Sequence, residues 1–199
     1  MINIVLFGAP GSGKGTQSAK IIDQFGLYHI STGEVLRDHI ARGTELGKTA
    51  ESYISKGNLI PDELIVDLIA HVIDNEAREA KGVVFDGFPR TIPQAEALRD
   101  MLEARGSRVH AVVGLEVPEE ELIERMLNRG KETGRADDNL DTIKNRLDVY
   151  HNQTHPLKEY YLKDGSYLPV NGSGSVEEIF DCIAAGIEEA TGEVRRSRK

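Results

Sequence analysis

The stretch GAPGSGKGT at residues 8–16 directly follows the apolar run INIVLF at residues 2–7. The apolar run predicts a buried strand, and residues 17–25 can continue as a helix. A glycine-rich turn between a strand and a helix lets backbone N–H groups close on phosphate oxygens, where the helix N-terminus adds positive potential. Lys14 supplies a mobile cation for the β and γ phosphates. We therefore predict a P-loop that binds a nucleoside polyphosphate.

The hydroxyl group of this loop is displaced by one position from the usual pattern. A Ser or Thr normally follows the lysine directly and reaches Mg²⁺, but here Gly15 follows Lys14 and the hydroxyl arrives with Thr16. The alternative is a tight turn between strand and helix that binds no ligand. The lysine and its flanking segments favour phosphate binding.

Composition narrows the class of protein. The 199 residues fit one domain with a sizeable core. The net charge of −9 disfavours a basic surface for nucleic acid or an anionic membrane. A single cysteine, Cys182, excludes an internal disulfide framework and a cysteine-cluster zinc site, and its apolar neighbours predict a core position. We find no secretory leader pattern and no apolar run of membrane length, so we expect a cytoplasmic enzyme.

Apolar, β-branched segments alternate with helical patterns, which predicts an α/β fold with a parallel sheet. Helices are expected after Pro61 and Pro118, each followed by acidic residues that suit the helix N-terminus, and near residues 137–139. A C-terminal helix is expected over residues 175–190, and the basic residues 195–199 beyond it are expected to be frayed and solvated. Strands are expected at residues 2–7, 27–30, 83–86, 109–117 and 167–170.

Two segments interrupt this alternation, residues 31–60 and residues 130–136. Both follow elements that should end at the carboxyl edge of the sheet, where α/β proteins bind their ligands, so both are candidate lids. Gly130 and Gly134 flank a polar loop in the second segment. The sequence is compatible with either a hinge or an ordinary turn in this loop.

The stretch VVFDGFPRT at residues 83–91 is the second strong signal. It predicts a strand that ends at Asp86, and a carboxylate at that place beside a P-loop can hold Mg²⁺ directly or through water. Arg90 follows in a turn constrained by Pro89. The alternative is a surface turn whose aspartate accepts hydrogen bonds from backbone donors.

Arginines form a third group. Arg125 and Arg129 share one helix face, and each arginine alone could be a solvated partner of a glutamate such as Glu121. Together, in an acidic chain with a P-loop, they indicate more anion binding than one nucleotide requires. Transfer between two phosphates needs cations that offset their repulsion, and guanidinium groups grip phosphate oxygens in pairs. The group comprises Arg37, Arg90, Arg125, Arg129, Arg135 and Arg146.

A phosphate acceptor removes the need for a general base, because a phosphate monoester with a second pKa of about 6 is mostly ionised at neutral pH. The sequence contains no obvious Ser/His/Asp or paired-glutamate arrangement, which agrees with such an acceptor. We therefore expect surface or core positions without a catalytic role for His29, His71, His110, His151 and His155.

Over nearly its whole length the chain resembles the adenylate kinases of the nucleoside monophosphate kinase family. The segments GAPGSGKGTQ, STGEVLR, GNLIPDE, FDGFPRTIPQ and RADDN, and then Arg146, occur in the family's order. The resemblance implies one P-loop domain of three layers with a five-stranded parallel sheet. Its core would comprise residues 1–30, 61–129 and 137–199, with a helical AMP-binding insertion at 31–60 and a short lid at 130–136.

The resemblance also implies the reaction ATP·Mg + AMP ⇌ 2 ADP, which maintains adenine nucleotide balance, in a monomer whose partners are ATP, AMP and ADP. The family's own pattern reads GKGT, which accounts for the position of Thr16. Only five residues separate Arg129 from Arg135, so the longer lid hairpin of many bacterial relatives and its zinc-binding cysteines are absent, and we expect no zinc.

Site residues carry over by position. The ATP phosphates would lie on Gly11, Ser12, Gly13, Lys14, Gly15 and Thr16. The AMP site would comprise Thr32, Arg37, Asn58, Leu59, Ile60, Gly87, Phe88, Pro89, Arg90 and Gln94, with Arg90 on the acceptor phosphate and Gln94 on the base edge. Arg125 and Arg129 would act on the ATP side, Arg135 and Arg146 would bridge the substrates, the Gly174 backbone would contact the ATP adenine, and Asp86 would act on Mg²⁺ mainly through waters.

Other functions stay open on the sequence alone. UMP/CMP kinases also have short lids, although they tend to have Ala and Asn where this chain has Thr32 and Gln94, which favours AMP. A regulatory P-loop NTPase would carry a guanine-reading Asn-Lys-x-Asp element, and none is present. A nucleotide-sensing module without turnover would leave the second group of arginines unexplained.

Overall fold

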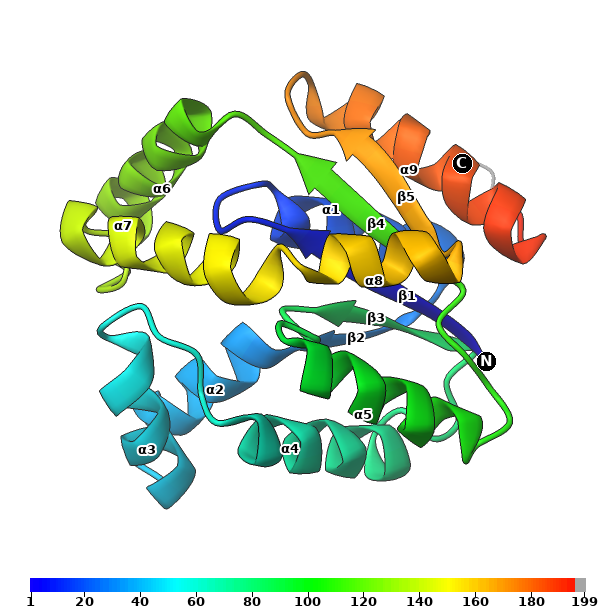
Figure 1. The fold of residues 1–199 in the computed structure, drawn as a ribbon, viewed down its shortest axis with the longest axis horizontal. Coiled ribbons are helices and arrows are strands. Elements are labelled where there is room, and N and C mark those ends of the chain that lie inside the picture. The colour runs from blue at the N-terminus through cyan, green and yellow to red at the C-terminus, as the bar shows by residue number, and fades with distance from the viewer. Residues whose placement is uncertain (196–199) are drawn as a thin grey trace.

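The computed structural model describes residues 1–195, in which strands and helices alternate along the chain (Figure 1). The strands are β1 (Ile2–Gly8), β2 (Tyr28–Ser31), β3 (Gly82–Asp86), β4 (Ala111–Glu116) and β5 (Tyr167–Asn171). The helices are α1 (Lys14–Phe25), α2 (Thr32–Ala41), α3 (Glu45–Ile54), α4 (Asp62–Asn75), α5 (Ile92–Glu103), α6 (Glu119–Thr133), α7 (Leu140–Val149), the π-helical turn η1 (Tyr150–Thr154), α8 (Leu157–Asp164) and α9 (Val176–Thr191).

The five strands form one parallel sheet in the order β2-β3-β1-β4-β5. The central strand β1 pairs Ile2 with Gly82 of β3 and Ile4 with Ala111 of β4. The predicted α/β class with a five-stranded parallel sheet is confirmed. The strand expected over residues 109–117 is shorter than predicted, since β4 covers only Ala111–Glu116.

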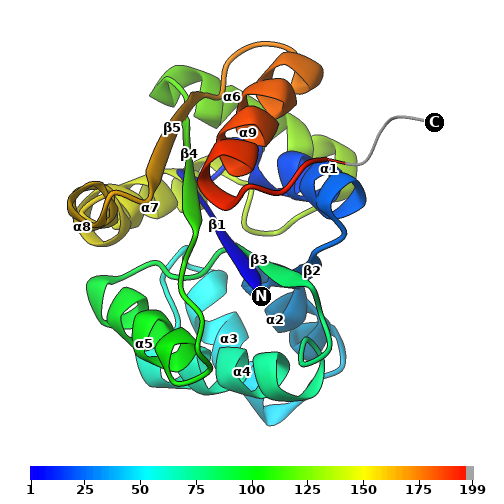
Figure 2. The same ribbon diagram turned by 90° about the vertical axis from the view of Figure 1, so that its right-hand side faces the viewer.

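Helices cover both faces of the sheet, because alternate residues of each buried strand point to opposite sides. Val5 and Phe7 of β1 face a cluster built from α4, α5 and α8, whereas Ile4 and Leu6 face a second cluster built from α1 and α9. Figure 2 shows α1 and α9 on one side of β1 and β4, with α8 on the other. The sheet is therefore the middle layer of three.

The P-loop joins β1 to α1, and α1 begins at Lys14, earlier than the sequence pattern predicts. Gly13 precedes the helix in a left-handed conformation with φ 97°. Gly11 has φ 83°, and a Cβ added there would lie 2.9 Å from Cγ of Met126. Both the backbone conformation and the close approach of α6 thus require a residue without a side chain.

The insertion at residues 31–60 contains α2 and α3. In the second candidate lid, α6 continues to Thr133, so Gly130 lies inside a helix rather than at the start of a polar loop. Gly134 ends that helix with φ 66°, and a Cβ there would meet no atom within 4 Å. The connection between α6 and α7 is therefore shorter than predicted, and whether it hinges stays a prediction.

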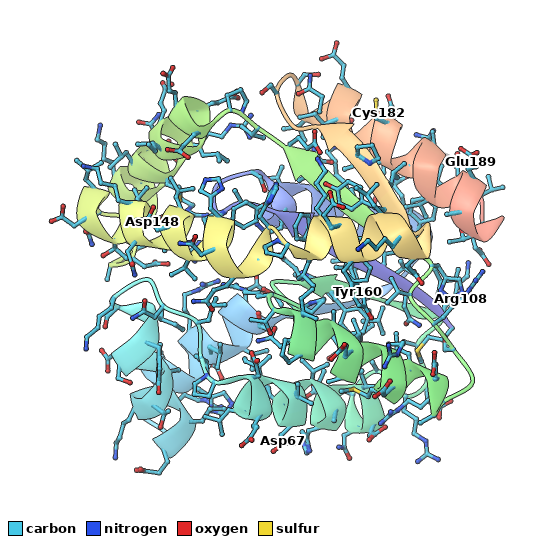
Figure 3. All side chains as sticks on the ribbon, viewed as in Figure 1. Asp67, Arg108, Asp148, Tyr160, Cys182 and Glu189 are labelled. Carbon is cyan, nitrogen blue, oxygen red and sulfur yellow. The ribbon has the colours of Figure 1, made fainter. Side chains whose placement is uncertain are left out.

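The predicted core position of Cys182 is wrong. Cys182 is exposed, and Figure 3 shows it on the outer side of α9. The buried residues of α9 recur with helical spacing at Ile179, Phe180, Ile183, Ala184 and Ile187, and position 182 falls on the opposite face. Apolar neighbours in sequence thus do not share its face of the helix.

The C-terminal segment also differs from expectation where it is described. Arg195 donates to Asp181 at 2.8 Å and to Glu188 at 3.2 Å, so it is tied to α9 rather than solvated. The remainder of the predicted basic tail, residues 196–199, lies outside the described residues. Among residues 1–195 we find no helix with the length and apolar character needed to cross a membrane.

Candidate active site

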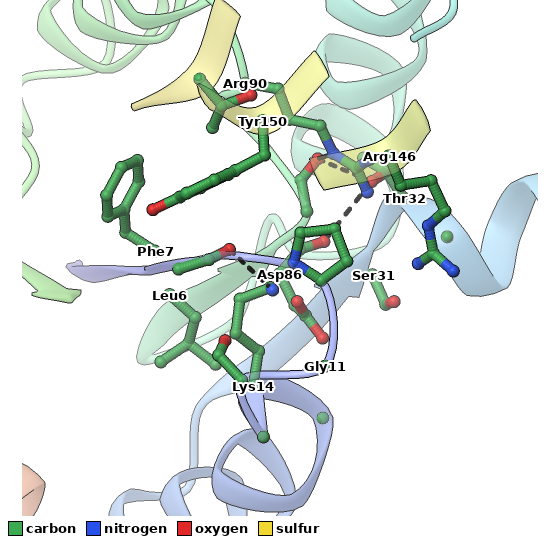
Figure 4. A pocket seen from close by; sticks show the side chains of 18 of the residues that line it. Leu6, Phe7, Gly11, Lys14, Ser31, Thr32, Asp86, Arg90, Arg146 and Tyr150 are labelled. Atoms are coloured by element: carbon green, nitrogen blue, oxygen red, sulfur yellow. Dashed lines mark hydrogen bonds between the residues drawn. The ribbon is translucent and has the colours of Figure 1, made fainter. Parts of the chain in front are cut away.

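A cavity of about 710 Å³ opens at the carboxyl ends of the strands. Figure 4 shows Lys14 and Asp86 low in this cavity, with Arg90 and Arg146 above them. The structure brings together nearly all predicted site residues as lining of this one cavity: Gly11, Ser12, Gly13, Lys14, Gly15, Thr16, Thr32, Arg37, Asn58, Leu59, Ile60, Asp86, Gly87, Pro89, Arg90, Gln94, Arg125, Arg129, Arg135, Arg146 and Gly174.

Phe88 is the exception among them. Its side chain is 1% exposed and belongs to the hydrophobic cluster under α4, α5 and α8 rather than to the cavity lining. An aromatic residue between Gly87 and Pro89 anchors the turn to the core, so its contribution to the site is the placement of its neighbours.

Lys14 lies against the loop that it belongs to. Its ammonium group donates hydrogen bonds to the carbonyl oxygens of Gly8 and Ala9, both at 2.9 Å. Burial, together with the positive charges of Arg90 and Arg146, lowers the pKa of Lys14 to about 8, although Asp86 opposes this change. The ammonium group therefore lacks a full anionic partner in the cavity.

Asp86 ends β3 beside the P-loop, as predicted. Burial alone would raise the pKa of its carboxyl group, but His29, Lys14 and Arg90 outweigh this effect and hold the pKa below its usual value. His29 Nε2 lies 3.8 Å from Asp86 Oδ2. That distance is longer than a normal hydrogen bond, so the ring makes a long polar contact with the carboxylate. His29, assigned no role from the sequence, thus faces the predicted metal-binding residue.

A tight turn holds Arg90 at the other side of the cavity. The carbonyl oxygen of Gly87 accepts hydrogen bonds from Arg90 Nε at 2.7 Å and from Thr32 Oγ1 at 2.9 Å. Gly87 has φ 81°, and a Cβ there would lie 2.6 Å from Thr32 Oγ1 and 2.8 Å from Arg90 Nη2. Only glycine fits between these two side chains. Burial and the nearby Arg146 lower the pKa of Arg90 to about 10.

Two buried aspartates hold the arginines of α6 and α7. Asp138 accepts hydrogen bonds from Arg129 Nε at 2.6 Å, from Arg129 Nη2 at 2.8 Å and from Arg146 Nη1 at 2.8 Å. Asp137 lies 3.1 Å from Arg146 Nη1 and 3.5 Å from Arg135 Nε. Hydrogen bonding to Asp138 raises the pKa of Arg129 despite its partial burial. The sequence pattern indicated only a helix start at these aspartates.

Arg125 connects α6 to the P-loop. Its guanidinium group donates to the carbonyl oxygen of Gly172 at 2.9 Å and to that of Ser12 at 3.4 Å, and it forms an ion pair with Glu121. Glu121 also accepts a hydrogen bond from Ser173 Oγ at 2.6 Å. Arg125 therefore has the glutamate partner that the sequence offered as an alternative to anion binding. It also lines the cavity, so the two roles occur together.

The cavity as a whole carries more positive charge than its carboxylates balance. Burial lowers the pKa of Arg37 and of Arg146, and the positive charge of a neighbouring arginine lowers each pKa further. Three buried polar atoms of the lining, Ser12 Oγ, Gln17 Oε1 and Arg135 Nε, have no hydrogen-bond partner. A buried cationic surface with unused hydrogen-bonding groups is suited to a polyanion such as a nucleotide phosphate chain.

Comparisons with known proteins agree with this chemistry. A family model described as adenylate kinase matches residues 6–166. The chain is 60% identical over 188 residues to the adenylate kinase of Bacteroides fragilis, with 94% of this chain and 99% of that protein covered. It is 59% identical over 187 residues to the adenylate kinase of Parabacteroides distasonis, covering 94% and 98%. It is 54% identical over 189 residues to that of Porphyromonas gingivalis, covering 95% and 97%. The chain therefore belongs to the adenylate kinase family.

Proposed function

We propose that this chain transfers the terminal phosphoryl group of ATP to AMP in the described cavity and uses the residues gathered there. The observation that carries the proposal is the meeting of two cationic groups, Lys14 on the P-loop and Arg90 on the turn after β3, in one cavity. One nucleotide would occupy the P-loop side and the other the side of α2 and the β3 turn. This arrangement supports transfer between two phosphorylated substrates.

On the donor side, the P-loop backbone would hold the phosphates of ATP. Lys14 would exchange its hydrogen bonds to Gly8 and Ala9 for phosphate oxygens, and a bound polyanion would restore the full charge that burial disfavours. Arg125 would fix the loop through Ser12, and Arg129 would face the same phosphates from α6.

On the acceptor side, Arg90 and Arg37 would grip the phosphate of AMP. An oxygen of that phosphate, already ionised near neutral pH, would attack the terminal phosphorus of ATP while the bond to the bridging oxygen of ADP breaks. Arg135 and Arg146 would stabilise the charge between the substrates, held in place by Asp137 and Asp138. Gln94 would contact the base of AMP.

The site also fits Mg²⁺ bound together with ATP. Among residues 1–195 no group of three His, Cys, Asp or Glu side chains could hold a metal. Mg²⁺ commonly uses one or two carboxylates, several waters and substrate phosphates, so Asp86 and the Thr16 hydroxyl form a suitable donor set. When bound, the ion would neutralise phosphate charge during transfer.

We also propose that the protein acts as a cytoplasmic monomer, where ATP, AMP and ADP are available. Light scattering coupled to size-exclusion chromatography tests the monomer, whose expected mass is 21.9 kDa.

The reaction itself is tested by mixing the purified protein with ATP·Mg and, separately, AMP, UMP, CMP or dAMP, and measuring ADP formation. AMP should be the preferred acceptor. Preference for UMP or CMP would contradict the proposed acceptor, and absence of ADP with every acceptor would contradict phosphoryl transfer.

A further inference from the structure

The amide group of Gln94 is fixed by two partners, the backbone of Arg90 and the side chain of Asp62. Its Oε1 accepts a hydrogen bond from the backbone N–H of Arg90 at 2.7 Å, and its Nε2 donates to Oδ1 of Asp62 at 2.7 Å. The Gln94 residue is 2% exposed and still lines the cavity. Both ends of this amide are therefore held before any substrate binds.

The two partners select the same orientation of the amide. A backbone N–H can only donate, so it requires the oxygen of Gln94, and a carboxylate can only accept, so it requires the nitrogen. The hydroxyl of Thr91 donates to the same Asp62 oxygen at 3.0 Å. Rotating the Gln94 amide by half a turn would place its oxygen against the Asp62 carboxylate and its NH₂ group against the N–H of Arg90.

A fixed amide leaves one N–H and one oxygen lone pair for a ligand, in a defined order. The Watson–Crick edge of adenine offers an amino donor at C6 and an acceptor at N1, which complement that pair. Hypoxanthine has the opposite order, with an oxygen at C6 and a donor at N1. We infer that Asp62 is a positioning residue that selects a 6-aminopurine by fixing the orientation of the Gln94 amide, an inference that rests on the proposed role of Gln94 at the AMP base.

Asp62 is suited to this role by its position. It is the first residue of α4, and it reaches across to α5, whose N-terminus is capped by Thr91 through a hydrogen bond from the backbone of Gln94 at 3.3 Å. Asp62 therefore acts through Gln94 and Thr91. A purely structural role, in which Asp62 only ties α4 to α5, makes different predictions for substrate choice.

The test compares AMP and IMP as acceptors at saturating ATP·Mg in two variants of Asp62. Asp62→Ala removes the acceptor and should raise KM for AMP about three- to tenfold, the loss expected for one hydrogen bond, while kcat changes little. The ratio of kcat/KM for AMP over IMP should fall, because only the backbone N–H of Arg90 then opposes reversal of the amide. Asp62→Asn keeps an oxygen acceptor at this place and should restore most of the AMP preference.

Glu63→Ala is the matched control, because Glu63 is an exposed acidic residue in the same first turn of α4. It removes the same charge from the same helix end and should leave both KM values unchanged. Circular dichroism and thermal unfolding of each variant separate loss of folding from loss of selectivity.

A double-mutant cycle with Gln94→Leu separates the possible failures. If Asp62 acts through Gln94, Asp62→Ala should add little to the AMP KM of Gln94→Leu. An equal effect of Asp62→Ala in both backgrounds, or an unchanged AMP-to-IMP ratio, would overturn the inference and leave the role of Gln94 intact. An unchanged KM for AMP in Gln94→Leu itself would overturn the proposed base contact.

Discussion

Replacing Lys14 with methionine should make the ligand-free protein more stable while removing its activity. Burial and neighbouring arginines lower the pKa of Lys14 from 10.5 to about 8. A difference of this size means that the protonated lysine destabilises the folded chain by about 3 kcal/mol. Because the cavity admits water and the two loop hydrogen bonds are lost, we expect a net gain of roughly 1–2 kcal/mol for Lys14→Met at pH 7.

The dependence of this gain on pH identifies its origin. Between about pH 8 and pH 10.5, the unfolded chain holds a proton on Lys14 that the folded chain has released. The stability of the wild-type protein relative to the variant therefore rises with pH in this window. The advantage of Lys14→Met should shrink by about 2 kcal/mol between pH 7 and pH 9.5 and so be nearly lost at the higher pH, measured by urea unfolding of both proteins.

Thermal unfolding gives a second measurement and a control. For a chain of this length, ~1–2 kcal/mol corresponds to about 2–8 °C in Tm. Lys20→Met removes a lysine that is ion-paired with Glu177 on the surface, and its free energy of unfolding should change by less than about 1 kcal/mol. A Tm of Lys14→Met at or below that of the wild type at pH 7, or a difference that stays constant up to pH 9.5, would refute the reasoning.

The other predictions concern the arginines and the turn that position the phosphates. Arg90→Lys should lower kcat by about 10²–10³ with an unchanged circular dichroism spectrum, since one ammonium group cannot replace a paired grip; near-normal kcat would remove Arg90 from the catalytic set. Asp138→Asn should weaken the hold on Arg129 and Arg146 and lower kcat/KM for ATP about tenfold or more, and steady-state kinetics unchanged from the wild type would contradict this role. Gly87→Ala should destabilise the fold by about 1–3 kcal/mol, and an unaltered urea midpoint would show that the turn relaxes freely.

Local patterns predicted the sheet and the phosphate side of the site because both depend on contiguous residues. Few structures other than a P-loop are compatible with a buried strand that is followed by glycines and a lysine. The strand that ends at Asp86 could likewise be predicted from contiguous residues. Gly130 shows the limit of this reasoning. A glycine in a polar segment suggested a loop, but α6 continues past it to Thr133 because helix propensity is a weak determinant and tertiary packing overrides it.

Residues that act across the fold carried no readable signal. Asp62 and Gln94 meet only because α4 and α5 pack side by side, and His29 faces Asp86 only because β2 pairs with β3. Asp138 was visible as part of a helix start, yet its hydrogen bonds to arginines of α6 and α7 depend on the angle between those helices. The sequence therefore predicted which chemistry is present more fully than it predicted which groups hold that chemistry in position.

The central place of β1 in the sheet has a consequence for how the chain folds during synthesis. Strand β1 can pair with β3 only after Gly82, the partner of Ile2, has been synthesised, and with β4 only after Ala111, the partner of Ile4. The P-loop of the nascent chain therefore has no neighbouring strand until three of the five strands have been made. On the face of the sheet that α1 and α9 share, the part not covered by α1 stays exposed until Ile179 and Ile187 of α9 pack against it. A chain interrupted on the ribosome before α9 would expose these apolar residues and would be prone to aggregate. Packing of α9 is therefore the folding event that removes this risk.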